Sequence, residues 1–177
     1  MKWSVLLRRF LRENITKCVI QSWKRPSRKH NSFPGLKRIG VPDIYVLVDT
    51  SGSMSKEELQ QGFAEIQAIA RSVHSAVTVV QWDCKVQRVD KLRSASDARK
   101  IEVRGRGGTE IFEALEWVLK NSKPRDIVII FSDFVIYDLD YELTRQDIQK
   151  LLQRNFVISL GTYREPPFGH RRIVIRG

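Results

Sequence analysis

The sequence predicts an α/β fold in which a mostly parallel sheet of about six strands is flanked by helices on both faces. Two compact apolar runs, Asp43–Asp49 and Asp126–Asp133, have the length and composition of fully buried strands. Segments with apolar residues at helical spacing follow each of them. Strands that alternate with helices favour a parallel sheet, and 177 residues suffice for one substantial core.

The first 40 residues differ from the rest. Residues 2–14 place apolar side chains opposite arginines, which predicts a short amphipathic helix. Residues 21–40 carry scattered Pro and Gly among basic residues, which is typical of an irregular linker. We therefore expect a basic helix and linker over residues 1–40 and a folded domain over residues 41–177.

Within the domain, the strand at 43–49 leads to Ser55 and Glu58, which have the spacing of a helix capping box. One face of the helix that follows would carry Leu59, Phe63, Ile66, Ile69 and Val73. Val77–Trp82 is a second predicted strand, and Lys85–Val89 is expected to pair back on it as an antiparallel edge hairpin.

The second half of the domain repeats this alternation. Arg93–Val103 is ambiguous between a short helix and an extended stretch, and Thr109 can cap the next helix. After the strand at 126–133, Thr144 opens another helix, and Phe156–Leu160 and Arg172–Ile175 supply the last strands. With right-handed crossovers, the result is a Rossmann-like, doubly wound sheet.

The formal net charge of +11 is concentrated at the N-terminus. Residues 1–40 contain eleven Lys or Arg and one acid, Glu13, whereas the remaining residues contain 20 basic and 19 acidic side chains. A basic arm suggests an acidic partner surface or nucleic acid, and a solvated extension without a ligand is an equally weighted alternative.

Compartment and membrane attachment follow from other features. The longest apolar run, Ile127–Phe131, is too short to span a bilayer, and the arginines near the start argue against a signal peptide. Cys18 and Cys84 form no metal or redox motif, so we expect two buried or idle thiols in a reducing cytoplasm, with one disulfide between them as the alternative.

Oxygen-bearing side chains gather where the buried strands end. Asp49 and Asp133 each end a strand, Ser51 and Ser53 follow the first, and Thr109 stands after Gly107-Gly108 in a later loop. Ligands of open α/β sheets bind beyond the carboxyl ends of strands, at the point where the strand order reverses. Two carboxylates and three hydroxyls suit Mg²⁺, with Mn²⁺ or Ca²⁺ as alternatives, whereas Zn²⁺ would favour His or Cys.

This pattern resembles the metal-ion-dependent adhesion site of von Willebrand factor A domains, in the segments DTSGSMS, GRGGTE and FSD. The resemblance implies that Ser51, Ser53 and Thr109 coordinate the ion directly or nearly so. It also implies that Asp49 and Asp133 act mainly through bound water. A Glu or Asp of a protein partner would complete the coordination.

A broader likeness covers nearly the whole chain. The segments QWDCKVQ, GGTE and the N-terminal WSVLLRRFL are similar to the C-terminal half of a prokaryotic family that joins a metallopeptidase-like region to an A-like domain. No HExxH motif occurs here, so no peptidase role is carried over. A-like proteins of this kind often work beside MoxR-type AAA+ ATPases, which makes such an ATPase an expected partner.

Residues near the metal pattern have simpler interpretations. Arg104 and Arg106 could attract acidic partners to the rim, although a solvated loop is the more ordinary interpretation. Asp83, Asp138 and Asp140 could line the same edge, but ordinary turn residues are the preferred interpretation. We interpret Trp82 and Trp117 as core residues and not as binding platforms.

The main functional hypothesis is a metal-dependent protein interaction module without catalysis, because the pattern offers no general base, nucleophile or second metal position. One alternative is a Mg²⁺-dependent phosphohydrolase with Asp49 as nucleophile, for which only Arg104 and Arg106 could assist the phosphate. Another is nucleic-acid binding by the basic arm, although no motif for base recognition is present.

Overall fold

Two compact units make up the chain in the computed structural model, residues Met1–Pro42 and Asp43–Gly177. The structure describes residues 5, 9, 19–26, 34–38, 41–72, 76–92, 97, 101–105 and 107–175. The second unit contains strands and helices that alternate along the chain: β3 (Ile44–Asp49), α2 (Lys56–Ser72), β4 (Val77–Trp82), β5 (Val86–Leu92), α4 (Phe112–Asn121), β6 (Ile127–Ser132), α5 (Glu142–Arg154), β7 (Phe156–Gly161) and β8 (Arg171–Val174).

The second unit is built on a six-stranded sheet in the order β5-β4-β3-β6-β7-β8. All neighbouring pairs are parallel except β4 and β5, which form the antiparallel edge hairpin. The chain moves outward from β3 through β4 to β5 and then crosses to β6 on the other side of β3. The predicted doubly wound α/β fold with one antiparallel edge is confirmed, and its order reverses between β3 and β6.

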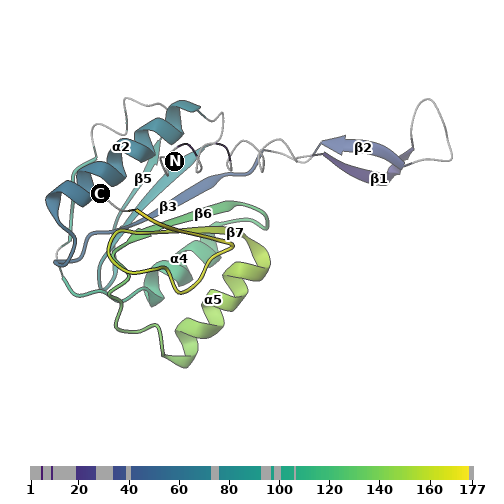
Figure 1. Cartoon of the computed structure of the whole chain (residues 1–177). Helices are drawn as coiled ribbons and strands as arrows, with labels where there is room; N and C mark the ends of the chain where they lie inside the picture. Colours follow the sequence, from purple (N-terminus) through teal and green to yellow (C-terminus); the bar gives the residue numbers. More distant parts are fainter. Residues whose placement is uncertain are drawn as a thin grey trace. The chain divides into compact units, whose positions relative to one another are not determined.

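The helices lie on both faces of this sheet, as Figure 1 shows, with α2 on one face and α4 and α5 on the other. The three central strands β3, β4 and β6 are buried along their whole length, as expected of strands covered on two sides. Trp82 at the end of β4 is fully buried, and Trp117 of α4 packs against the same core. Both tryptophans therefore have the core role predicted for them.

Helix α2 begins with the predicted capping box. Glu58 N–H donates to Ser55 Oγ at 3.1 Å, and Ser55 N–H donates to Glu58 Oε2 at 2.8 Å. Leu59 and Ile66 of the predicted apolar face are buried, and Gly62 lies among them. A Cβ at Gly62 would lie 2.7 Å from the Phe131 ring of β6, so glycine lets the helix approach the sheet closely.

The start of α4 differs from its prediction. Thr109 was expected to cap this helix, but the N-cap is Ile111, which makes no side-chain capping bond. The Asp138 carboxylate instead accepts hydrogen bonds from the backbone N–H groups of Ile111 at 2.9 Å and Phe112 at 2.8 Å. The capping group thus comes from a loop 27 residues further along the chain, which a local sequence pattern does not indicate.

Helix α5 begins earlier than predicted, with Tyr141 as its N-cap. Thr144, expected to open the helix, is buried in its first turn, and its hydroxyl lies 3.5 Å from Asp138 Oδ2. A single carboxylate therefore links the starts of two neighbouring helices.

The N-terminal unit contains a hairpin where an irregular linker was predicted. Strands β1 (Val19–Pro26) and β2 (Pro34–Arg38) pair in antiparallel fashion. The two prolines lie opposite each other at the end of the ladder, where a missing N–H is tolerated, so they do not exclude strands. The amphipathic helix predicted for residues 2–14 lies, apart from residues 5 and 9, outside the described residues.

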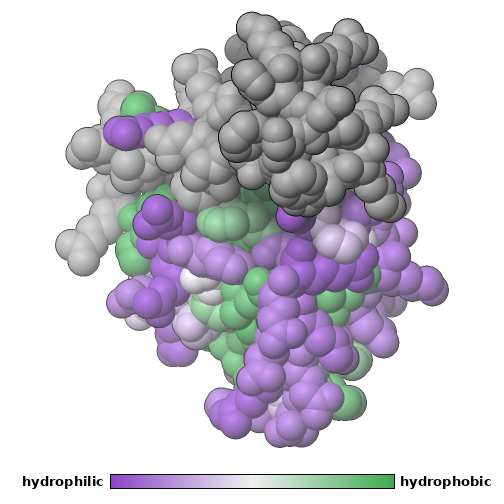
Figure 2. Space-filling view, turned by 90° about the vertical axis from the view of Figure 1, so that its right-hand side faces the viewer, coloured by the Kyte–Doolittle hydropathy of each residue, from purple (hydrophilic) through white to green (hydrophobic). Residues whose placement is uncertain are grey.

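Hydrophilic residues cover most of the described surface on the face seen in Figure 2, with hydrophobic residues in smaller patches between them. Within the described part of the chain, no helix has the length and apolar character needed to cross a membrane. Cys84 is a free, exposed thiol rather than a buried one, and Cys18 lies outside the described residues.

Candidate metal centre

The site predicted from the sequence lies at the carboxyl edge of the sheet, between β3 and β6. Asp49 is the last residue of β3, and Asp133 directly follows β6. The two strands pair in parallel with Val48 opposite Phe131, so Asp49 lies beside Ser132. The reversal of strand order leaves room for a ligand above these two strand ends.

Asp49 is fully buried, and both of its carboxylate oxygens accept hydrogen bonds. Ser51 N–H donates to Oδ1 at 2.9 Å, and the Ser132 hydroxyl donates to Oδ2 at 2.5 Å. The pKa of Asp49 is raised to about 6, with burial as the largest cause; hydrogen bonds from Ser132 and Ser51 oppose this rise, and the nearby negative charge of Asp133 adds to it. The site thus holds a carboxylate in an orientation that favours a positive ion beside it.

Ser51 and Ser53 face each other across the loop that follows Asp49. Their Oγ atoms lie 3.0 Å apart, with Ser51 buried and Ser53 exposed. Gly52 between them donates its N–H to the Gly107 carbonyl at 3.1 Å. This bond ties the first predicted loop to the loop that carries Thr109.

Thr109 is buried, and the loop before it is held by Asp83. Asp83 Oδ2 accepts a hydrogen bond from Gly107 N–H at 3.1 Å, and the Asp83 carbonyl accepts one from Glu110 N–H at 3.0 Å. Burial alone would raise the pKa of Asp83, but hydrogen bonds from the Gln87 side chain and from backbone N–H groups, Gly107 among them, lower it below its usual value. Asp83 is a turn residue, as predicted, since its Oδ1 accepts a hydrogen bond from Lys85 N–H at 3.1 Å in the β4–β5 turn, and it is also the anchor of this loop.

Glycine is required in the same loop by close packing. Gly105 has a φ of +121°, and a Cβ there would collide with Thr50 Oγ1. A Cβ at Gly107 would lie 2.9 Å from Asp83 Oδ2. The glycines let the loop lie directly against the end of β4 and the loop after β3.

Asp133 begins the third loop and is also buried. Its Oδ1 accepts a hydrogen bond from Val135 N–H at 2.9 Å, and Phe134 adopts the left-handed conformation with a φ of 56°. Further on, Tyr137 donates its N–H to the Thr109 carbonyl at 3.0 Å. The second and third loops are therefore joined as well, and all five predicted residues lie on three loops that contact one another.

The residues present fit a hard divalent cation. Asp49 and Asp133 are both buried, yet among the described residues neither forms an ion pair with a basic side chain. Two unpaired buried carboxylates are unfavourable unless a positive ion offsets their charge. Over the described ranges no three His, Cys, Asp or Glu side chains group as metal ligands, so the hydroxyls would have to supply the remaining donors.

The predicted rim is only partly described. Arg104 is exposed, and its guanidinium lies 4.0 Å from the Glu102 carboxylate, a distance typical of a weak surface pair. Its backbone N–H donates to Gln81 Oε1 at 2.8 Å. Arg106 lies outside the described residues.

Ser132 is a residue of the site that our sequence analysis missed. It is fully buried, donates to Asp49, and accepts a hydrogen bond from Phe134 N–H at 2.9 Å. Its place directly before the strand-end Asp133 was visible in the segment FSD, but the sequence did not show that it would face Asp49, 83 residues away.

Residues 44–172 match the family described as VWA-like domain (DUF2201). The chain belongs to this family. Over 117 residues it is 32% identical to an uncharacterized protein of Thermotoga maritima, a match that covers 66% of this chain and 29% of the relative. The VWA-like chain thus corresponds to less than a third of that relative's length.

Solved structures share the fold at low sequence identity. Proximal thread matrix protein 1 from the mussel byssus, in a form with a zinc-occupied MIDAS motif, has a TM-score of 0.56 and 21% identity, covering 76% of this chain and 39% of that one. A von Willebrand factor type A protein from Catenulispora acidiphila has a TM-score of 0.55 and 16% identity, covering 72% and 34%. The VWA-like α/β fold is therefore found in both of these proteins.

Proposed function

We propose that this VWA-like domain binds one divalent cation, Mg²⁺, and uses it to capture a carboxylate of a protein partner. The observation that carries the proposal is the pair of buried carboxylates, Asp49 and Asp133, without a basic partner among the described residues. Ser51, Ser53 and Thr109 would provide hydroxyl donors around the ion. Neutral hydroxyl ligands leave the ion electron-poor, so an incoming carboxylate should bind it well.

The orientation of Asp49 favours binding over catalysis. Both of its oxygens already accept hydrogen bonds, from Ser51 and Ser132, which suits a group that orients bound water and the first ligands. A phosphohydrolase would need one of these oxygens as a nucleophile and a positioned cation for the phosphate. Arg104 is exposed and beside Glu102, so it supports that alternative poorly.

Two further points support the choice of ion and partner. The fold neighbour from the mussel byssus holds zinc in its MIDAS motif, which favours a divalent ion at the equivalent place in this chain. The all-oxygen donor set leads us to propose Mg²⁺ in place of zinc. As partner we propose a protein with an exposed Asp or Glu, and the sequence resemblance points to a MoxR-type AAA+ ATPase in the cytoplasm.

The test compares two aspartates at opposite ends of the same strand. Asp133 follows the carboxyl end of β6, whereas Asp126 precedes its amino end, where it accepts hydrogen bonds from Asp43 N–H at 3.0 Å and Lys123 N–H at 2.7 Å. Wild type and Asp126→Asn should both gain thermal stability when MgCl2 replaces EDTA, whatever their starting Tm. Asp133→Asn and Asp49→Asn should show no gain, because each removes a carboxylate from the site.

Isothermal titration with Mg²⁺ or Mn²⁺ gives the affinity directly. We expect the two site variants to lose at least about 10-fold in affinity, the scale of a lost metal-site group. An equal response to Mg²⁺ in wild type and Asp49→Asn would refute the metal site.

A further inference from the structure

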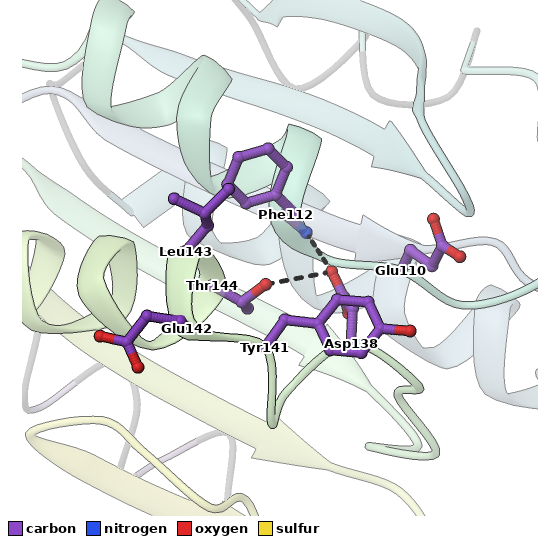
Figure 3. Close-up of a pocket in the computed structure, with 7 residues that line it drawn as sticks. All are labelled: Glu110, Phe112, Asp138, Tyr141, Glu142, Leu143 and Thr144. Carbon is purple, nitrogen blue, oxygen red and sulfur yellow. Dashed lines mark hydrogen bonds between the residues drawn. The ribbon is translucent and has the colours of Figure 1, made fainter.

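A cavity lies next to the metal centre, between the starts of α4 and α5. Its volume is about 490 Å³, within the range of pockets that take up a ligand group. Figure 3 shows its side chains, with Phe112 and Leu143 on one side and Tyr141 in front of Asp138. Glu110 lines the cavity and directly follows the metal-site residue Thr109 in the sequence.

The walls of this cavity are apolar and partly exposed. Tyr141 is 65% exposed and Leu143 is 62% exposed, although both are large hydrophobic side chains. Tyr137, whose backbone N–H donates to Thr109, is 71% exposed. Exposed tyrosines beside a binding site are typical of protein interfaces, because they supply contact area at a low entropic cost.

The charge of the cavity is negative. Figure 3 shows Glu110 and Glu142 at opposite ends of the lining, with their carboxylates pointing away from each other, and Asp138 between them. Arg145, in the first turn of α5, pairs with Asp140 at 2.8 Å and does not line the cavity. As far as the described residues show, the lining thus contains three acids and no basic residue.

An anion is a poor fit to this cavity even though two helices begin there. The first N–H groups of α4 are already bonded to Asp138, so they are not free for a ligand. Glu110 and Glu142 would repel an incoming carboxylate or phosphate.

We propose that this cavity receives an arginine side chain of the same protein partner whose carboxylate binds the metal, a proposal that builds on the function given above. The apolar walls suit the methylene stem of arginine, and the rings of Tyr141 and Phe112 suit its planar guanidinium. The negative charges of Glu110 and Glu142, one at each end of the cavity, complement its positive charge without both carboxylates having to contact it. The partner segment would then be recognised by an acidic residue at the metal and by a basic residue next to it.

The first experiment tests the cavity without the metal. N-acetyl-arginine amide carries the cation and no carboxylate, and it is titrated into the 177-residue chain in EDTA while backbone amide NMR signals are followed. We expect saturable shifts at Phe112, Leu143 and Thr144 with millimolar affinity. N-acetyl-norleucine amide, which has a similar stem without the charge, should bind at least about fivefold more weakly, as expected if charge recognition adds roughly 1 kcal/mol.

Matched variants separate the cavity from general surface charge. The double variant Glu110→Gln/Glu142→Gln should lower the affinity for the arginine probe at least about fivefold. The control, Glu113→Gln/Glu116→Gln, removes two exposed glutamates of α4 that do not line the cavity and should leave the affinity unchanged. Thermal melts of both double variants confirm that they are folded.

The second experiment joins the two sites. Flexible Gly-Ser peptides with one Glu and one Arg, separated by two to six residues, are compared with peptides that lack either side chain, in the presence of Mg²⁺. At the best spacing we expect the joined peptide to bind at least about 10-fold more tightly than either single-residue peptide, because the second contact becomes intramolecular. Asp49→Asn should remove the contribution of the peptide's Glu to the affinity. Glu110→Gln/Glu142→Gln should remove the contribution of its Arg.

The outcomes distinguish the two proposals. If the arginine probe binds in EDTA but Mg²⁺ does not bind, the metal proposal fails and the cavity remains. Three results would each refute the arginine cavity, whether or not the metal binds. They are equal affinity for the norleucine and arginine probes, higher affinity for N-acetyl-aspartate amide, and unchanged affinity of Glu110→Gln/Glu142→Gln for the arginine probe.

Discussion

Asp49 has a property that a surface aspartate lacks, since its pKa of about 6 lies well above the ordinary aspartate value of 3.8. Burial is the main cause, and the adjacent Asp133 adds to it. The folded protein therefore binds a proton at this site more readily than the unfolded chain does. The free energy of unfolding therefore depends on pH through Asp49.

We expect the metal-free protein to lose the contribution of Asp49 to its stability as the pH rises. Because the folded pKa is the higher one, the folded state binds more protons between pH 4 and 6, and the free energy of unfolding falls over this window and stays lower above it. The shift corresponds to at most about 3 kcal/mol. Urea unfolding in EDTA measures it at pH 4.5, 5.5 and 7.

Other carboxylates also titrate in this range, so the informative quantity is the difference between wild type and Asp49→Asn. That variant should be more stable than wild type at pH 7 in EDTA, and this advantage should shrink at pH 4.5. With Mg²⁺ at pH 7 the order should reverse, because the ion stabilises only the protein that keeps its carboxylate. A difference that does not change with pH would contradict the raised pKa.

At the scale of elements, the helix starts depend on residues outside the helices. Helix α4 has no side-chain cap of its own. The Asp138 carboxylate, which lies in another loop, accepts hydrogen bonds from the first backbone N–H groups of the helix. The same carboxylate lies near Thr144 of α5, so it joins both helices to the loop that begins at Asp133. The position of Thr109 before α4 thus depends on Asp138.

We predict that Asp138→Ala lowers the free energy of unfolding by about 2 kcal/mol, because a helix cap is lost and buried N–H groups keep no partner. Urea unfolding provides the measurement. Asp140→Ala is the control, since its side chain is 91% exposed and its pair with Arg145 contributes little. Equal losses in the two variants would show that Asp138 does not act as the shared cap.

At the scale of the whole molecule, charge and core belong to different units. Nearly all of the excess positive charge lies in residues 1–40, whereas the buried core that the described residues form lies in Asp43–Gly177. The metal centre draws its described contacts from the second unit alone. We therefore predict that the fold and the candidate site form without the basic arm.

Deletion of residues 1–42 should leave a folded domain with the same gain in Tm from Mg²⁺. If the arm binds nucleic acid, the 177-residue chain should retain RNA or DNA at low salt and release it steeply as salt rises, while the truncated chain should not retain it. Filter binding at 50 and 200 mM salt tests this. Undiminished retention by the truncated protein would exclude a role for the arm, and loss of the Mg²⁺ response would contradict the separation of the units.

The sequence by itself determined which segments become strands and helices of the domain, because burial and periodicity are local properties. Val77–Trp82 has the predicted bounds, and Ser55 and Glu58 form the predicted capping box. The oxygen-rich residues at the strand ends were also visible as a spaced pattern, from Asp49 to Asp133. Pro26 and Pro34 misled us because a proline at a strand end and a proline in a linker have the same sequence signal.

Only the tertiary structure decided how the loops meet. Ser132 donates to Asp49 across 83 residues, Asp83 holds Gly107 across 24, and Asp138 caps α4 across 27. Such pairings depend on the order of strands in the sheet, and local propensity carries no information about partners so far apart in the chain. The acidic, tyrosine-lined cavity beside Thr109 depends on the same assembly, since its walls come from the starts of two helices that the sheet brings together.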